Sequence, residues 1–324
     1  MRKISAKAHP VQGLLCAHGY KNVERKTLPV ESLFTSLEAF HTVIEFTFLD
    51  DESIKPVINM KGHDVSDDAY QRITGFVERI FKILNIRSSY SLDIELNFPL
   101  AVGIGSSASI FAAITWCIVS FTGKELPGKE ISVLARLGSH SAAASILGNI
   151  SIIRKGEFAE VLCQAESFPY KILVLPVEGK KRSEELHEDM PHSPFYSSWL
   201  KFARKTSDSL STLISEKRFN EIGPIAEKYI HTNFAAISTG PRNILTWNHE
   251  TFRRVILLRE LRTELKGKFF ISTNSGPALF VYAELKELEI LKEKLDELDI
   301  ESVISDVGGP ASLLSNTNLS SRSG

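Results

Sequence analysis

Glycine and serine residues gather in one segment, Pro99-Leu-Ala-Val-Gly-Ile-Gly-Ser-Ser-Ala108, between an expected strand and an expected helix. Glycines such as Gly103 and Gly105 let backbone amides approach a ligand closely, and amides at a helix N-terminus attract anions. Ser106 and Ser107 add hydroxyl donors at the same point. The spacing matches neither GxxxxGK(S/T) nor GxGxxG, the two common nucleotide motifs. The segment therefore predicts phosphate binding, and an ordinary serine-capped turn is the alternative.

The cysteines and the charge balance argue against several other kinds of chemistry. Cys16, Cys117 and Cys163 are far apart without CxxC spacing, which indicates reduced, buried thiols and no metal site. The 38 Lys and Arg residues nearly balance 39 Asp and Glu residues, so we expect no nucleic-acid partner. The most apolar run, 110–121, is shorter than the ~20 residues that span a bilayer, and the first residues lack the apolar core of a signal peptide. We therefore expect a cytoplasmic protein that does not contact a membrane.

Hydrophobic periodicity places these residues on a mixed set of elements. In the first half, alternating apolar residues predict a strand pair at 44–48 and 57–60 and a strand at 92–98. Apolar residues at helical spacing predict a helix that begins after Ser66, a good N-cap residue. Further elements are expected as helices at 109–121 and 129–137 and as strands at 150–153 and 172–177.

The second half is richer in helices. Helices are expected near 195–215, 219–231, 248–265 and 284–297, and strands at 269–273, 279–283 and 302–305. At roughly 100–200 residues per domain, a chain of 324 residues has room for two lobes. We therefore predict an α+β protein with one lobe at 1–178, a second at 179–311, and a frayed polar tail at 312–324.

The glycine–serine segment also resembles a family signature. It is similar to the PxxxGLGSSA motif of the GHMP small-molecule kinase superfamily, and Asn97 to Ala108 resembles the longer NFPxxxGLxSSA loop of its mevalonate diphosphate decarboxylase branch. Other segments resemble that branch in the same order along nearly the whole chain: Lys21 with Leu28-Pro29, Leu134-Ala-Arg-Leu-Gly-Ser-His-Ser-Ala142, Ser275-Gly-Pro277 and Val307-Gly308. The resemblance implies a ribosomal-S5-like N-terminal lobe, a ferredoxin-like C-terminal lobe and a site in the cleft between them. It also implies a homodimer, which is common among these relatives.

Three charged positions of the family pattern are neutral in this chain. Ala17 replaces the first Lys of the KYWGK motif, and Ala144 replaces an Arg that pairs with the substrate carboxylate. Asn274 stands where the family has a catalytic Asp, which orients or deprotonates the C3 hydroxyl for phosphorylation by ATP. An amide cannot act as a base. A chain with Asn274 would not need that step if its substrate already carried a 3-phosphate.

This reasoning favours one function over two alternatives. The chain resembles most the archaeal mevalonate 3,5-bisphosphate decarboxylases, so we expect it to release isopentenyl phosphate, CO2 and phosphate in isoprenoid biosynthesis, with no cofactor. The retained glycine–serine loop favours an alternative that depends on ATP and Mg2+, either a mevalonate 3-kinase or a decarboxylase of mono- or diphosphomevalonate. The loss of three charged residues also permits a non-catalytic GHMP protein that binds a ligand or a partner.

The resemblance implies a set of site residues around the phosphorylated mevalonate. The expected catalytic residues are Lys21, Ser139, Ser141 and Asn274, the last as a hydrogen-bond donor. The expected phosphate and substrate contacts are Gly103, Gly105, Ser106, Ser107 and Ala108 of the loop, together with His18, His140, Lys180, Lys181, Arg182, Ser183 and Ser275. The structural alternatives are helix packing for the serines, core burial for the histidines and a solvated loop for 180–182.

Overall fold

The computed structural model describes residues 1–179 and 183–318. Within them, the strands form three sheets, ordered β13-β1-β4-β6-β5, β2-β3-β7-β8 and β10-β11-β9-β12. The strands are β1 (Arg2–Ala8), β2 (Val11–Leu15), β3 (Ser32–Ser36), β4 (Thr42–Leu49), β5 (Val57–Met60), β6 (Ser89–Leu96), β7 (Ile150–Arg154), β8 (Phe158–Cys163), β9 (Lys171–Leu175), β10 (Phe270–Ser272), β11 (Leu279–Ala283), β12 (Val303–Ser305) and β13 (Ser312–Asn318). The helices are α1 (Asp67–Leu84), α2 (Ser106–Thr122), α3 (Gly128–Arg136), α4 (Ala142–Leu147), α5 (Ser183–Asp189), α6 (Tyr196–Ser215), α7 (Ile222–Ser238), α8 (His249–Glu264) and α9 (Leu285–Glu297), with short 3-10 helices at Ala165–Ser167, Met190–His192 and Phe219–Glu221.

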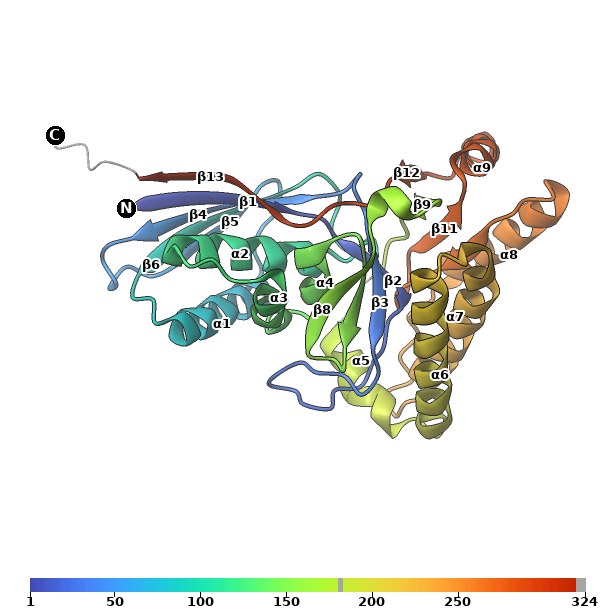
Figure 1. The fold of residues 1–324 in the computed structure, drawn as a ribbon, viewed down its shortest axis with the longest axis horizontal. Helices are drawn as coiled ribbons and strands as arrows, with labels where there is room; N and C mark the ends of the chain where they lie inside the picture. Colours follow the sequence, from blue (N-terminus) through green and yellow to red (C-terminus); the bar gives the residue numbers. More distant parts are fainter. Residues whose placement is uncertain (180–182, 319–324) are drawn as a thin grey trace.

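The first lobe is built on the five-stranded sheet, with α1 to α4 gathered below it in the view of Figure 1. The expected cap of α1 is confirmed, because the Ser66 hydroxyl accepts a hydrogen bond from the Ala69 amide at 3.3 Å. Helix α2 begins at Ser106, three residues earlier than its hydrophobic run indicates. It is apolar on nearly all sides because it packs between the sheet and neighbouring helices.

A shared core joins the first lobe to the second. Strands β9 to β12 form the second lobe's sheet, and α7 and α9 pack against it. One continuous cluster of buried side chains runs from Leu14 on β2 to Phe280 on β11 and includes Trp199 on α6. Burial of this apolar surface stabilises the two lobes as one unit. Strand β2 therefore lies next to the second lobe.

The structure contains four strands that the sequence does not predict, β1, β2, β3 and β8, and it differs from the expected sheets in three further ways. Strands β4 and β5 do not pair with each other, because β5 lies parallel to β6, which separates it from β4. Strand β9 pairs with β11 and β12, so the second lobe's sheet begins before the expected boundary at residue 178. The expectation of a frayed tail is wrong for residues 312–318, which form β13 and pair with β1. Within the described residues, none of the helices combines the length and the apolar character needed to cross a bilayer.

Candidate active site

The glycine–serine loop contacts the second lobe directly. Gly103 has a φ of 79°, and a Cβ at this position would lie 2.6 Å from the backbone nitrogen of Ala278. Only glycine therefore fits between the loop and the turn of the second lobe. Two backbone bonds join the loop to the segment after β9, from the Val177 amide to the Val102 carbonyl at 3.3 Å and from the Gly179 amide to the Ala101 carbonyl at 3.0 Å.

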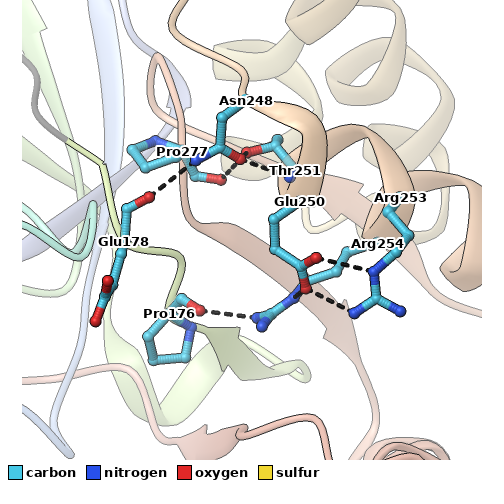
Figure 2. A network of polar contacts seen from close by, with 8 residues as sticks. All are labelled: Pro176, Glu178, Asn248, Glu250, Thr251, Arg253, Arg254 and Pro277. Carbon is cyan, nitrogen blue, oxygen red and sulfur yellow. Dashed lines mark hydrogen bonds and ion pairs between the residues drawn. The ribbon is translucent and has the colours of Figure 1, made fainter.

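The turn at 274–277 is held by the N-terminus of α8, as Figure 2 shows. The Thr251 hydroxyl donates to the Pro277 carbonyl at 2.9 Å, while the Asn248 side chain accepts from the Thr251 amide and donates to the Glu178 carbonyl, both at 2.9 Å. Arg254 donates to the Pro176 carbonyl at 2.8 Å. These bonds connect the turn to the segment that ends at Gly179, so the two walls of the cleft share one support.

Three charged residues on α8, one acid and two arginines, stabilise this link between the turn and the segment that ends at Gly179. Glu250 accepts hydrogen bonds from Arg253 and Arg254 at 2.6 to 2.8 Å (Figure 2). The hydrogen bond from Arg253 has the largest effect on the pKa of Glu250, burial opposes it, and the hydrogen bond and charge of Arg254 lower it further, so this pKa falls to about 2. The carboxylate therefore stays charged and keeps Arg254 aligned with the carbonyl of Pro176.

Asn274 lies at the point where the two lobes meet. Its Oδ1 accepts a hydrogen bond from the backbone amide of Gly13 on β2. A backbone N–H can only donate, so this contact identifies which end of the carboxamide is the oxygen. The side chain also lines the cavity, and the NH2 end is the group left to hydrogen-bond a ligand there. Asn274 is therefore oriented as a donor toward the cavity.

A cavity of about 380 Å3 lies between the loop, the turn and α5. Of the residues expected in the site, its walls include His18, Gly103, Gly105, Ser106, Ser107, Ser139, His140, Ser141, Ser183, Asn274 and Ser275. The structure thus brings residues of the first lobe, such as His18, together with residues of the second lobe, such as Ser275. Lys21 is exposed and Ala108 is buried beneath the loop, and neither lines the cavity. Lys180, Lys181 and Arg182 lie outside the described residues.

The serine pair lies beside a neutral histidine. The Ser139 and Ser141 hydroxyls are 3.1 Å apart, ahead of and at the start of α4. His140 Nδ1 donates to the Lys26 carbonyl at 3.2 Å, and its Nε2 accepts from the Ser32 hydroxyl at 3.3 Å. Burial lowers the pKa of His140 to about 3. His140 therefore lines the cavity as an uncharged group and does not replace a missing cation at neutral pH.

His18 contacts the turn from the other side of the cleft. Its Nε2 lies 3.2 Å from the Ser275 hydroxyl, and both residues are buried. The side chain of His18 therefore joins the first lobe to the residue that follows Asn274. The contact places an imidazole and a hydroxyl together on the cavity wall.

Five cavity residues with polar or ionisable side chains were not predicted from the sequence, namely Cys16, Tyr20, Arg72, Glu184 and His187. The Tyr20 ring stacks on His187 with ring centroids 4.1 Å apart. Glu184 accepts from the Tyr20 hydroxyl at 3.0 Å and from Lys26 at 2.7 Å, so both of its oxygens have partners. Cys16 and Tyr20 could have been predicted, because they lie beside or within the motif segment from Ala17 to Lys21. No motif near Arg72 on α1 or His187 on α5 predicts that these residues reach the cavity.

The two alanines that replace family charges have different surroundings. Ala17 lines the cavity, and its backbone amide donates to the Ser32 hydroxyl at 3.2 Å. Ala144 is fully buried on α4, in a small apolar cluster with Ala108 and Phe34. Among the described residues that line the cavity, Arg72 is the single Lys or Arg and Glu184 the single acid. This part of the wall offers mainly neutral donors.

The fold and the cleft have the arrangement that the family resemblance implies. Residues 8–165 match the family model described as the diphosphomevalonate decarboxylase-like N-terminal domain. The expected α+β fold and the resemblance to the mevalonate diphosphate decarboxylase branch are therefore confirmed.

Relatives support the same placement over the whole length. Phosphomevalonate decarboxylase of the archaeon Haloferax volcanii is 26% identical over 318 residues, which cover 96% of this chain and 98% of that protein. Diphosphomevalonate decarboxylase of Bos taurus is 26% identical over 191 residues, or 54% of this chain and 46% of that protein. The chain is therefore a homologue of decarboxylases that act on mevalonate phosphates.

Solved structures agree on the fold. Mevalonate diphosphate decarboxylase from Enterococcus faecalis superposes with a TM-score of 0.88 at 24% identity, covering 97% of this chain and 99% of that chain. The enzyme from Staphylococcus aureus superposes with a TM-score of 0.89 at 21% identity, with the same coverage.

Proposed function

We propose that this chain is an ATP-independent decarboxylase that converts mevalonate 3,5-bisphosphate to isopentenyl phosphate, CO2 and inorganic phosphate. In this reaction the bond between C3 and the phosphate oxygen breaks, and the phosphate leaves with the electron pair. The C1–C2 bond breaks at the neighbouring carbon, C1 departs as CO2, and the electron pair of that bond forms the C2=C3 double bond. The protein must stabilise the departing phosphate without holding the carboxylate too strongly.

The orientation of Asn274 carries the proposal. Its oxygen accepts from the Gly13 amide, which leaves the NH2 group of this cavity-lining side chain to donate to a substrate. An amide NH2 can donate to the oxygen that links C3 to the departing phosphate, and that bond strengthens as charge develops there. It cannot remove a proton from a hydroxyl. This geometry favours a substrate that arrives already phosphorylated at C3.

The loop and the start of α2 are the proposed receptor for the departing phosphate. Ser106 and Ser107 occupy the first turn of α2, where backbone amides have no partner within the helix and the helix dipole favours an anion. Arg72 lines the same cavity. The serine pair at 139 and 141 supplies neutral donors for the carboxylate end. Because no Arg stands at position 144, the carboxylate is held less tightly in the ground state, which favours its loss as CO2.

A second candidate function is an ATP-dependent decarboxylase of a phosphomevalonate. Two observations favour it, the relative from Haloferax volcanii that matches over the full length and the carboxylate of Glu184 in the cavity wall. The loop amides with Ser106 and Ser107 fit nucleotide phosphates as well as substrate phosphate. ATP with Mg2+ would supply the 3-phosphate in that case. Glu184 would then have to give up Lys26 or Tyr20 to act on a hydroxyl.

One assay separates these functions. Purified protein is incubated with mevalonate 5-phosphate, 5-diphosphate and 3,5-bisphosphate, each with and without ATP and Mg2+, and CO2 and phosphate are measured. Release of both products from the bisphosphate without nucleotide supports the proposal. Strict dependence on ATP overturns it in favour of the second candidate, and a lack of turnover under every condition favours a non-catalytic protein.

Glu184→Gln is the matched variant for this assay. Under the proposal, Glu184 takes no part in proton transfer, so the variant should lose less than about fivefold in kcat, the scale of a part-exposed ion pair. Under the second candidate, a residue needed as a base would cost about 100-fold or more. A loss of that size, seen only in the ATP-dependent reaction, would contradict the proposal.

A further inference from the structure

A buried polar network lies directly behind Asn274. Its hub is Gln12 on β2, which is fully buried, as are Thr35 on β3, Ser272 on β10 and Tyr282 on β11. Gln12 and Thr35 belong to the first lobe's strands, and Ser272 and Tyr282 belong to the second lobe's sheet. The network therefore bridges the two lobes at their contact. Buried polar groups are costly unless they are paired, so such a cluster needs a reason.

Every polar group of the Gln12 carboxamide has a partner. Nε2 donates to the Gly13 carbonyl at 2.6 Å and to the Ser272 hydroxyl at 3.0 Å. Oε1 accepts from the Tyr282 hydroxyl and from the Thr35 hydroxyl, the latter at 3.3 Å. An amide has two donor hydrogens and two acceptor lone pairs, so these four bonds saturate it. Its orientation is fully determined.

Gly13 connects this hub to Asn274. Its carbonyl accepts from Gln12 and, at 3.3 Å, from Ser272, and its amide donates to Asn274. The β2–β3 ladder shifts register between Gly13 and Leu15, so the backbone departs from regular pairing at this point. Because Ser272 and Asn274 bind opposite polar groups of Gly13, its placement sets where the Asn274 amide points.

We propose that Gln12 is a positioning residue for the reaction and acts through Gly13 and Asn274. Gln12 fixes the Gly13 carbonyl by a hydrogen bond and so keeps the Gly13 amide in position to donate to the Asn274 oxygen. The NH2 group of Asn274 is then left for the substrate. The inference rests on the proposed role of Asn274 as a donor. It does not require Gln12 to touch the substrate, and Gln12 does not line the cavity.

The test is a double-mutant cycle. Gln12→Met removes the amide with little change in volume and leaves the Gly13 carbonyl without its strongest donor. We expect kcat to fall about 10- to 100-fold with KM changed by less than about threefold, the scale of a donor lost from the transition state. In an Asn274→Ala background the same change should cost less than about twofold, because the group that Gln12 positions is gone. An equal loss in both backgrounds would overturn the inference.

Thr35→Val is the matched control. It removes a hydroxyl that contacts the Gln12 side chain, the Gln12 backbone carbonyl at 3.4 Å and Tyr282, while the bonds from Gln12 and Ser272 to the Gly13 carbonyl remain. It should lower the thermal midpoint in the way that Gln12→Met does, while kcat stays within about threefold of wild type. A drop in kcat equal to that of Gln12→Met would show that any damage to the network is sufficient, which contradicts a specific path through Gly13.

A readout without turnover separates this inference from the function itself. In protein labelled with 15N-asparagine, the side-chain NH2 signals of Asn274 are identified by their loss in Asn274→Ala. They should shift and broaden in Gln12→Met and stay in place in Thr35→Val, whichever substrate the enzyme uses. Unchanged signals in Gln12→Met would overturn the positioning role, even if the bisphosphate reaction is observed. Shifted signals in a protein without that reaction would support the positioning role and overturn only the proposed function.

Discussion

The substitution Asn274→Asp tests the central chemical argument. In the variant one carboxylate oxygen can keep the hydrogen bond from the Gly13 amide, so the side chain can stay in place. The second oxygen then replaces the NH2 group on the cavity wall. A donor becomes an acceptor, and a negative charge faces the phosphate that must leave. If the reaction is elimination of a preinstalled phosphate, both changes oppose it.

The geometry gives the expected size of the loss. Removing a hydrogen bond to a charged group costs ~1.5–3 kcal/mol. Asn274→Ala removes only this bond, so its kcat should fall about 10- to 150-fold. In the Asp variant, a unit charge ~4 Å from one phosphate charge adds about 4 kcal/mol at an effective dielectric constant near 20. The total of about 5.5–7 kcal/mol predicts a loss of about 10^4- to 10^5-fold. The activity order is therefore wild type, Asn274→Ala, Asn274→Asp.

The assay is CO2 release from mevalonate 3,5-bisphosphate, measured from pH 5 to 8. A carboxyl group beside a phosphate has a raised pKa, and its protonated form can donate again. The Asp variant should therefore recover activity relative to wild type as the pH falls, and Asn274→Ala should not. We also expect neither variant to phosphorylate mevalonate derivatives with ATP, because Ala17 and Ala144 still differ from the kinase pattern. ATP turnover by Asn274→Asp, or an Asp variant more active than Asn274→Ala at pH 8, where the carboxyl is ionised, would refute the reasoning.

Three further predictions concern residues that lie in or next to the cavity. Gly13→Ala should lower both kcat and the thermal midpoint. The new Cβ would lie 2.8 Å from the Cys16 Cβ and 3.0 Å from the Asn274 side-chain oxygen, so one of them must move. An unchanged kcat would contradict the role of Gly13. Alkylation of Cys16, a partly exposed cavity residue, should inactivate the enzyme, and substrate should slow the reaction. Cys117 and Cys163 are buried and should react more slowly. Inactivation that substrate does not slow would argue against the site. The pKa of His140 is about 3 in the folded protein, against about 6.5 for an ordinary histidine, so the unfolded chain binds more protons between these pH values and stability falls as the pH drops through this window. In urea unfolding from pH 4 to 7, His140→Gln should flatten that dependence by up to about 1.4 kcal/mol per pH unit, and an identical slope would show that His140 is not the neutral buried group.

The fold could be predicted where the signal is local. Helix α1 was found with its cap because Ser66 and the apolar spacing act within a few residues. Strand β13 was missed because its polar sequence shows no strand pattern, and only pairing with β1, some 300 residues earlier, makes it a strand. The partner of β5 was missed for another reason: periodicity predicts a strand but does not predict which strand lies beside it.

The site could be predicted only in part for a similar reason. The motif resemblance supplied the loop, the serine pair and Asn274, which all line one cavity. Arg72 and His187 were missed because they reach the cavity from the exposed side of α1 and from a short helix after the loop at 180–182. Lys21 was expected as catalytic, yet its side chain does not line the cavity. A matching motif position specifies a residue type but not the direction in which the chain presents it.

The three lost charges are best understood together. An enzyme that transfers phosphate to a hydroxyl needs a base and benefits from cations that fix the carboxylate. An enzyme that expels a phosphate already in place needs donors at the leaving group, and tight fixation of the carboxylate would stabilise the ground state against loss of CO2. Asn274 as a donor agrees with the second set of requirements, and so does Ala144, which is enclosed by apolar neighbours and leaves that position without charge. Glu184 is the one carboxylate among the described cavity residues, and its two oxygens are occupied by Lys26 and Tyr20. The chemistry therefore depends on whether those two partners hold Glu184 in place once substrate is bound.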